Sequence, residues 1–165
     1  MTFAPRTFVV GEVVSAAIMN QEIRDQFNSM FAAWTAYTPT WTSSSTNPVL
    51  GNGTLTGRHM KIGRTCLCHI NLTTGSTTTY GTGNYSFSLP FTSANTGSTI
   101  IGNAQLLGTD RWAGHMLIGN SASTTSPFFS SSSTNPRLGW MSPTLPETLA
   151  AGAQVRMTFL YETAA

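Results

Sequence analysis

The sequence predicts a mainly β protein: a β-sandwich or jelly-roll-like domain preceded by one N-terminal amphipathic α-helix. Three observations lead to this prediction. Apolar side chains recur at helical spacing within residues 15–34, and beyond them short alternating segments are separated by turn signals about every 8 to 12 residues. Ser and Thr occupy 45 positions, and β-branched Thr suits pleated strands. We therefore divide the chain into an N-terminal segment, residues 1–36, and a β domain, residues 37–165.

The helix is expected between Ser15 and Trp34. Ser15 can cap its first turn, and no Pro or Gly interrupts the segment. Its apolar side chains recur in steps of three or four residues and share one helix face: Met19, Ile23, Phe27, Met30 and Trp34. This face is covered either by the chain's own sheet or by other copies in a short parallel bundle. We prefer a bundle of three chains, with these residues as the trimer interface.

The β domain is expected to consist of short strands between turn-rich loops. The candidate strands are Thr38–Trp41, Thr54–Ile62, Arg64–Leu72, Tyr85–Leu89, Thr99–Leu107, Trp112–Ile118, Arg137–Met141 and Gln154–Tyr161. Two of them alternate clearly, so one face of each should turn to the core. These faces carry Cys66, Cys68, Ile70 and Leu72 in one strand, and Val155, Met157, Phe159 and Tyr161 in the other.

One loop sequence occurs twice. The stretch SSSTNPVLG at 43–51 returns as SSSTNPRLG at 131–139, with Val49 replaced by Arg137. It contains no His, carboxylate or cysteine, so a duplicated catalytic loop is not indicated. Asn-Pro favours a turn, and Leu-Gly can re-enter a strand. We expect two similar corners of one sandwich.

The closely spaced cysteines are the main candidate for a metal site, because thiolates and imidazole bind zinc. On a strand, however, Cys66 and Cys68 point to one face while His69 points to the other. No second cysteine pair completes a tetrahedral site. We therefore expect core thiols, no metal and no cofactor.

Sparse charge narrows the range of activities and partners. Charged residues make up 8% of the chain and the net charge is +2, so no basic face is available to neutralise many phosphates of a nucleic acid. Asp and Glu number 6, which leaves few general bases, and we expect no catalytic residue and no enzyme. No membrane span or secretory signal is evident, because no long uninterrupted apolar run occurs.

Two tryptophans are candidates for ligand contact. Aromatic rings present flat apolar faces that suit sugar rings. Trp112 follows Arg111, and Trp140 follows Arg137 closely. If the protein binds a glycan, we expect it at these four residues.

Three stretches carry a resemblance to a known group of proteins. The segment Pro5 to Met30 is similar to the N-terminal segment of small tail-fibre, minor tail and related virion structural proteins of actinobacterial phages. The matching residues are Pro5, Arg6, Thr7, Phe8, Gly11, Glu12, Val13, Asn20, Arg24 and Asp25. The stretches Tyr37 to Thr65 and Gly83 to Pro90 resemble parts of the β domain of the same proteins. Together the three stretches cover about half of the chain.

The resemblance implies a homotrimer in the virion, assembled in the host cytoplasm. Its N-terminal segment, with Pro5, Arg6, Phe8, Gly11 and Glu12, would anchor it to other phage virion proteins, and the β domain would project outward. The expected function is a structural one, as a short tail fibre or baseplate adhesin that contacts host-surface polysaccharide. The alternatives are a capsid decoration or head-fibre protein at threefold positions, and a stand-alone carbohydrate-binding module.

Overall fold

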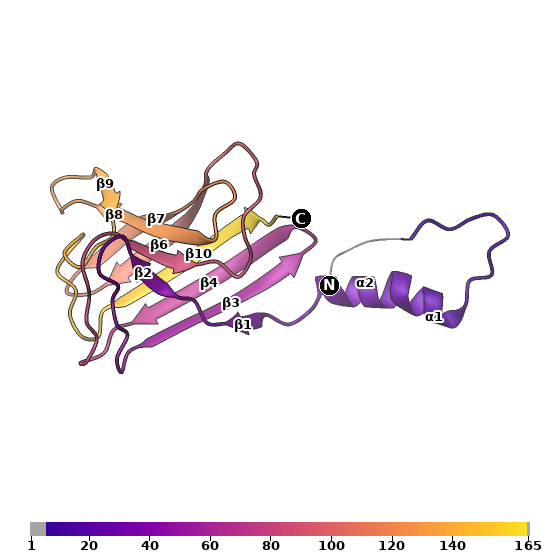
Figure 1. Ribbon diagram of the computed structural model, residues 1–165, viewed down its shortest axis with the longest axis horizontal. Helices are drawn as coiled ribbons and strands as arrows, with labels where there is room; N and C mark the ends of the chain where they lie inside the picture. The colour runs from indigo at the N-terminus through magenta and orange to yellow at the C-terminus, as the bar shows by residue number, and fades with distance from the viewer. Residues whose placement is uncertain (1–5, 165) are drawn as a thin grey trace.

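The computed structural model describes residues 6–164, apart from the side chain of Ser29, and confirms a mainly β protein with one N-terminal helical segment (Figure 1). This segment consists of α1 (Ala16–Met19), the π-helical η1 (Asn20–Asp25) and α2 (Gln26–Met30), which follow one another directly. The expectation that the helix continues to Trp34 is wrong. Phe31 leaves the helical conformation, with φ −107° and ψ 13°, and the chain turns toward the sheet.

The sheet contains all the strands of the described residues. They are β1 (Thr35–Tyr37), β2 (Trp41–Ser43), β3 (Thr54–Ile62), β4 (Thr65–Thr73), β5 (Tyr85–Ser88), β6 (Ile100–Leu107), β7 (Arg111–Ile118), β8 (Thr124–Ser130), β9 (Leu138–Trp140) and β10 (Gln154–Glu162). The order across this 10-stranded sheet is β1-β3-β4-β10-β6-β7-β8-β5-β2, with β9 paired to β8. Neighbouring strands pair antiparallel throughout.

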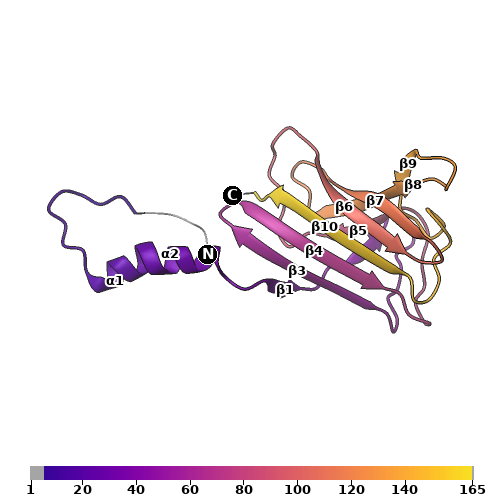
Figure 2. The same cartoon turned by 180° about the vertical axis from the view of Figure 1, so that it is seen from behind.

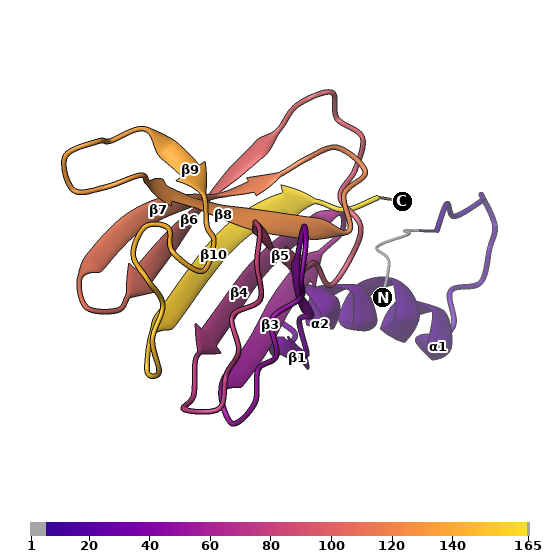
Figure 3. The ribbon, with the colours of Figure 1, turned by 60° about the vertical axis from the view of Figure 1, so that its left-hand side comes forward.

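The sheet curls on itself, so that a half-barrel encloses the core (Figure 3). β8 and β5 pass across the face that β4 and β10 present. The alternating faces predicted for β4 and β10 are confirmed, because every one of their inward residues is at most 2% exposed. Aromatic side chains from β5 and β8, including Phe87 and Phe129, close the core from the other side.

Two predictions about strands are corrected. Thr38–Trp41 is not one strand: β1 ends at Tyr37 and β2 begins at Trp41, with Pro39, which has no N–H to donate, between them. The strand β8 was not predicted. Pro127 lies in its middle, and proline usually argues against an internal strand. The Pro127 carbonyl instead accepts a hydrogen bond from the Met141 N–H (2.9 Å).

The helical segment lies beyond one end of the β domain (Figures 1 and 2). The chain runs from this segment into the sheet beside the hairpin between β3 and β4, near the C-terminal end of β10. The short strand β1 forms the connection by pairing with β3, with Thr35 opposite His59. The molecule thus consists of the β domain and a projecting arm, by which we mean residues 6–34 with the loop and the helical segment.

Candidate functional site

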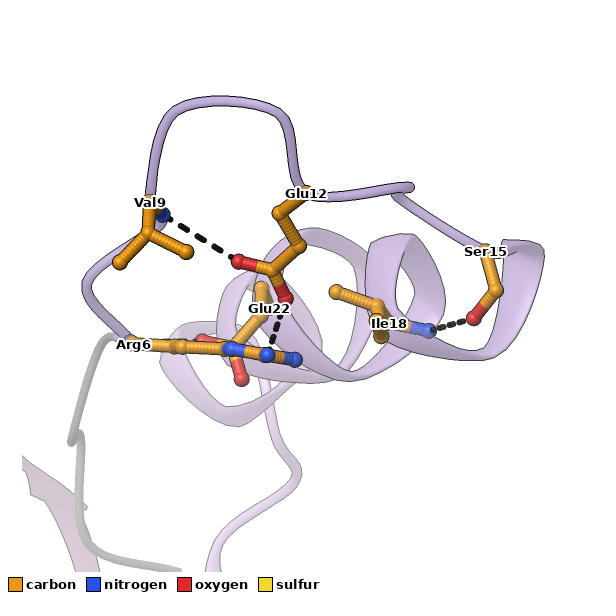
Figure 4. Close-up of polar contacts among 6 residues, drawn as sticks. All are labelled: Arg6, Val9, Glu12, Ser15, Ile18 and Glu22. Carbon is orange, nitrogen blue, oxygen red and sulfur yellow. Dashed lines mark hydrogen bonds and ion pairs between the residues drawn. The ribbon is translucent and has the colours of Figure 1, made fainter.

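Two of the residues proposed for anchoring, Arg6 and Glu12, meet in a loop that folds back on the helix (Figure 4). The backbone N–H of Arg6 donates to the Glu22 carboxylate (2.9 Å), and the Arg6 guanidinium forms an ion pair with Glu12. Glu12 also accepts from the Val9 N–H (3.3 Å), and its own N–H donates to the Val9 carbonyl (3.1 Å). Gly11, with φ +85°, provides the left-handed turn between them.

Phe8 lies under the Arg6 guanidinium, 5.7 Å from the ring centre. Four of the five predicted anchoring residues therefore form one local structure, and Pro5 lies outside the described residues. Hydrophobic side chains cover the outside of the loop: Val9, Val10 and Val13 are 68%, 107% and 85% exposed. The loop thus combines an internal ion pair with an apolar outer surface.

The helix presents an uncovered apolar face. Ser15 caps the first turn as predicted, accepting from the Ile18 N–H (3.3 Å). Four predicted interface residues lie along the helix, and their exposed fractions are 44% for Met19, 46% for Ile23, 57% for Phe27 and 39% for Met30. We call these four residues the helix face. Side chains this exposed are available to another molecule.

Trp34, the fifth residue assigned to this face, lies elsewhere. Its ring meets His69 edge-on, with 4.6 Å between ring centres, and the Arg58 guanidinium lies 5.1 Å from its centre. Burial and then the nearby Arg58 charge lower the pKa of His69. Trp34 therefore attaches the arm to the outer face of its own sheet.

A cleft lies beside Trp112. It has a volume of about 450 Å³ and is lined by Asp110, Arg111, Trp112, Ser130, Ser132, Ser133 and Pro136. The turn between β6 and β7 forms one wall, and the second copy of the duplicated loop forms the other. An indole ring, a carboxylate, a guanidinium and several hydroxyls are groups that commonly contact sugars, which combine apolar ring faces with hydroxyl edges.

Glu147 holds the Trp112 wall in place. Its carboxylate accepts from the Trp112 Nε1–H (2.8 Å), the Thr109 N–H (2.7 Å) and the Asp110 N–H (3.1 Å). Burial acts to raise the pKa of Glu147, but these three donors outweigh burial and hold that pKa below its ordinary value. The Glu147 carboxylate is thus a fixed support for the turn.

The second predicted ligand pair does not line this cleft. Trp140 pairs with Phe128 across β8 and β9, and their ring centres are 4.2 Å apart. Phe129 points into the core, so Phe128 and Trp140 lie on the outer face of the sheet. Trp112, in contrast, packs against the core. Arg137 is exposed at the end of the duplicated loop, and the four candidate residues therefore do not form one surface.

The two copies of the duplicated loop have different surroundings. The first is tied to a neighbouring loop: Thr46 and Val49 form bridges with Thr82 and Thr79. The second closes on itself as the hairpin between β8 and β9, where the Ser131 N–H donates to the Arg137 carbonyl (2.8 Å). The prediction of two similar corners is therefore wrong. A local turn sequence does not determine what lies beside it.

The cysteines are core thiols, as predicted. Cys66 and Cys68 are free and fully buried, and burial raises the pKa of both, that of Cys68 to about 12. The Tyr37 hydroxyl lies 3.2 Å from the Cys68 sulfur. Within residues 6–164 no group of three or more His, Cys, Asp or Glu side chains is placed to hold a metal ion. No helix among these residues is long and apolar enough to cross a membrane.

Comparison with known proteins identifies a distant relative. Over 77 residues the chain is 36% identical to a protein of Haemophilus influenzae named Mu-like prophage FluMu defective tail fiber protein. The match covers 47% of this chain and 12% of the relative. No protein-family model and no solved structure matches the chain. The chain therefore has distant, partial homology to a phage tail fiber protein, and spans only a small part of that protein's length.

Proposed function

We propose that the protein is a structural component of a bacteriophage tail, a short trimeric fibre or baseplate adhesin that works by assembly and binding rather than catalysis. The uncovered helix face carries this proposal. The name of the Haemophilus relative favours the tail over capsid decoration. Membership of an actinobacterial group stays a prediction from the N-terminal resemblance.

The helix needs a partner for physical reasons. Isolated helices of about 12–15 residues are at the margin of stability in water even when they are rich in alanine, and the helical segment spans only residues 16–30. Fully burying one large apolar side chain contributes about 1.5–3 kcal/mol. Covering the helix face with the same face of sister copies supplies such burial, and a closed three-chain bundle leaves no copy with an uncovered face.

The loop around Arg6 and Glu12 is proposed as the contact with other virion proteins. Its ion pair contributes only about 0–1 kcal/mol in an exposed position, but it biases the loop toward one conformation and so reduces the entropy lost when a partner docks. The exposed side chains of Phe8, Val9 and Val10 then provide the apolar contact. This arrangement puts anchoring and trimerisation in the arm, and leaves the β domain to project.

The helix proposal is tested by the double variant Ile23→Asp/Phe27→Asp. We expect the variant to elute from a sizing column with light-scattering detection as a single chain, while the wild-type protein elutes as a trimer. The matched control is Asn28→Asp, an exposed helix position outside the helix face. A double variant that keeps the wild-type mass would contradict the proposal.

The cleft beside Trp112 supports a second function, binding of a host-surface glycan. The test measures retention of the protein on immobilised bacterial cell-wall polysaccharides. We expect Trp112→Ala to lose binding by about ten-fold or more, and Trp140→Ala, on the outer face of the sheet, to keep it. Equal binding by both variants and wild type would exclude the cleft as the glycan site.

A further inference from the structure

A row of apolar side chains crosses the outer face of the sheet. Its members come from five strands and are Met60, Leu67, Leu160, Ile101 and Leu117. Three of them lie between residues buried in the core: Leu67 between Cys66 and Cys68, Leu160 between Phe159 and Tyr161, and Leu117 between Met116 and Ile118. Met60 and Ile101 are paired with Leu67 and Leu117 and therefore share their face of the sheet. Alternation therefore turns these side chains outward. We call this set the outer row.

The strand register places these residues side by side. Met60 is paired with Leu67, Leu67 with Leu160, and Ile101 with Leu117. The paired part of β10 and β6 ends at Thr158 and Asn103. Two residues further along, the same register places Leu160 opposite Ile101. Backbone contact supports this continuation, because a side chain added to Gly102 would collide with Phe159. The row is thus a continuous band across β3, β4, β10, β6 and β7.

The outer row differs from the row next to it. Its neighbour consists of Arg58, His69, Thr158, Asn103 and His115, paired in the same order. A sheet face open to water normally carries polar residues like these. Leu160 and Ile101 are nevertheless 56% and 66% exposed. A contiguous apolar band on an otherwise polar face indicates a contact surface.

We propose that the outer row is a second contact between copies of the chain, so that the β domains touch one another when the helices associate. This inference rests on the proposed trimer. The location of the row supports it: Trp34, which leads out of the helix, packs on Arg58 and His69 in the adjacent row. Copies joined through their helices therefore meet at this end of the sheet.

The area that assembly needs also supports a second contact. A specific interface buries about 800 Å² on each partner. Even a large aromatic side chain offers only about 150–250 Å², and none of the four residues of the helix face is more than 57% exposed. The helix face alone therefore falls short, and the outer row extends it from the arm onto the β domain.

The test uses new surface cysteines. Cys66 and Cys68 are both 0% exposed, so a cysteine placed on the surface reacts selectively with iodoacetamide in the folded protein. Leu160→Cys probes the outer row. Asn71→Cys is the matched control, because Asn71 is exposed on the same face but lies about 13 Å along β4 from Leu67. Both are made with the native helix and with Ile23→Asp/Phe27→Asp.

With the native helix we expect the new thiol of Leu160→Cys to be alkylated about ten-fold more slowly than that of Asn71→Cys, and with the disrupted helix we expect equal rates. Equal rates in a protein that still sediments as a trimer would overturn the outer-row contact and leave the proposed trimer intact. Slow alkylation in both helix backgrounds would show that the chain covers its own row, and would also overturn the inference. A wild-type protein that sediments as a monomer would overturn both proposals.

Discussion

Residues 6–34 and the β domain place their apolar side chains in opposite ways. Among the described residues, sixteen large hydrophobic side chains are exposed, and ten of them lie between Phe8 and Phe31. Within residues 6–164, in contrast, every buried hydrophobic residue lies at or after Trp41. The β domain closes on itself because its curled sheet brings two apolar faces together, whereas the arm is a single helix and a loop.

This contrast separates folding from assembly. The β domain encloses a core of its own, including Ile70, Phe129 and Phe159, so it should stay folded as a single chain. The arm has two ion pairs, Arg6–Glu12 and Arg24–Asp25, which contribute about 0–1 kcal/mol each when exposed, and one helix cap, which contributes about 1 kcal/mol. Its order should therefore depend on contacts with other chains.

The largest expected difference in the free energy of unfolding is between two phenylalanine truncations, one in the β domain and one in the arm. Phe159→Ala removes a side chain that is 2% exposed and should lower the free energy of unfolding by about 3–5 kcal/mol. Phe27→Ala should change it by less than about 0.5 kcal/mol at a concentration where the chain is monomeric. Urea unfolding followed by tryptophan fluorescence measures both. A large loss for Phe27→Ala would mean that the arm is part of the folded core.

Replacing Glu147 should lower the free energy of unfolding of the β domain by a smaller amount. Glu147→Ala removes three hydrogen bonds, of which the part-buried one to Trp112 cannot be replaced fully by water, and should cost about 1–1.5 kcal/mol. Because the pKa of Glu147 is lowered in the folded protein, its stabilisation is complete above its ordinary pKa and is lost as the pH falls through the lower folded value.

Urea unfolding between neutral pH and pH 3 should therefore show a smaller acid-induced loss in Glu147→Ala than in the wild-type protein. Glu22→Gln in the arm is the control and should leave the unfolding of the β domain unchanged at neutral pH. Identical pH profiles for Glu147→Ala and wild type would contradict the role assigned to Glu147.

Substitutions in the two copies of the duplicated loop should change the free energy of unfolding least. Asn47 accepts from the Ser43 N–H (2.9 Å) in the copy that is tied to a neighbouring loop. Asn135 accepts from the Arg137 N–H (3.1 Å) in the exposed hairpin. We expect Asn47→Ala to cost about 1 kcal/mol and Asn135→Ala less than about 0.5 kcal/mol, by urea unfolding. The reverse order would show that the hairpin is the more strongly supported loop.

Local pattern was enough to predict the faces of β4 and β10, because burial of one face imposes a period of two on the sequence. It was not enough for the end of the helix. Ala32 and Ala33 favour a continued helix, but packing of Trp34 on His69 and pairing of β1 with β3 draw the chain into the sheet. Tertiary contacts override propensity at this point.

The candidate ligand residues show the same division. Trp112 and Arg111 could be selected from the sequence as an aromatic ring beside a charge, and they do line a cleft. The support from Glu147 could not be selected, because it lies 35 residues away from Trp112 and meets it only through the fold. Nor could sequence alone show that Trp140 lies on the outer face of the sheet.

The mass of the wild-type chain in solution decides whether the arm joins three copies. Sedimentation equilibrium at micromolar concentrations should give about three times the 17.6 kDa of one chain, because the helix face is covered by sister copies. A mass of one chain across that range, with the helix still folded by circular dichroism, would contradict the proposal.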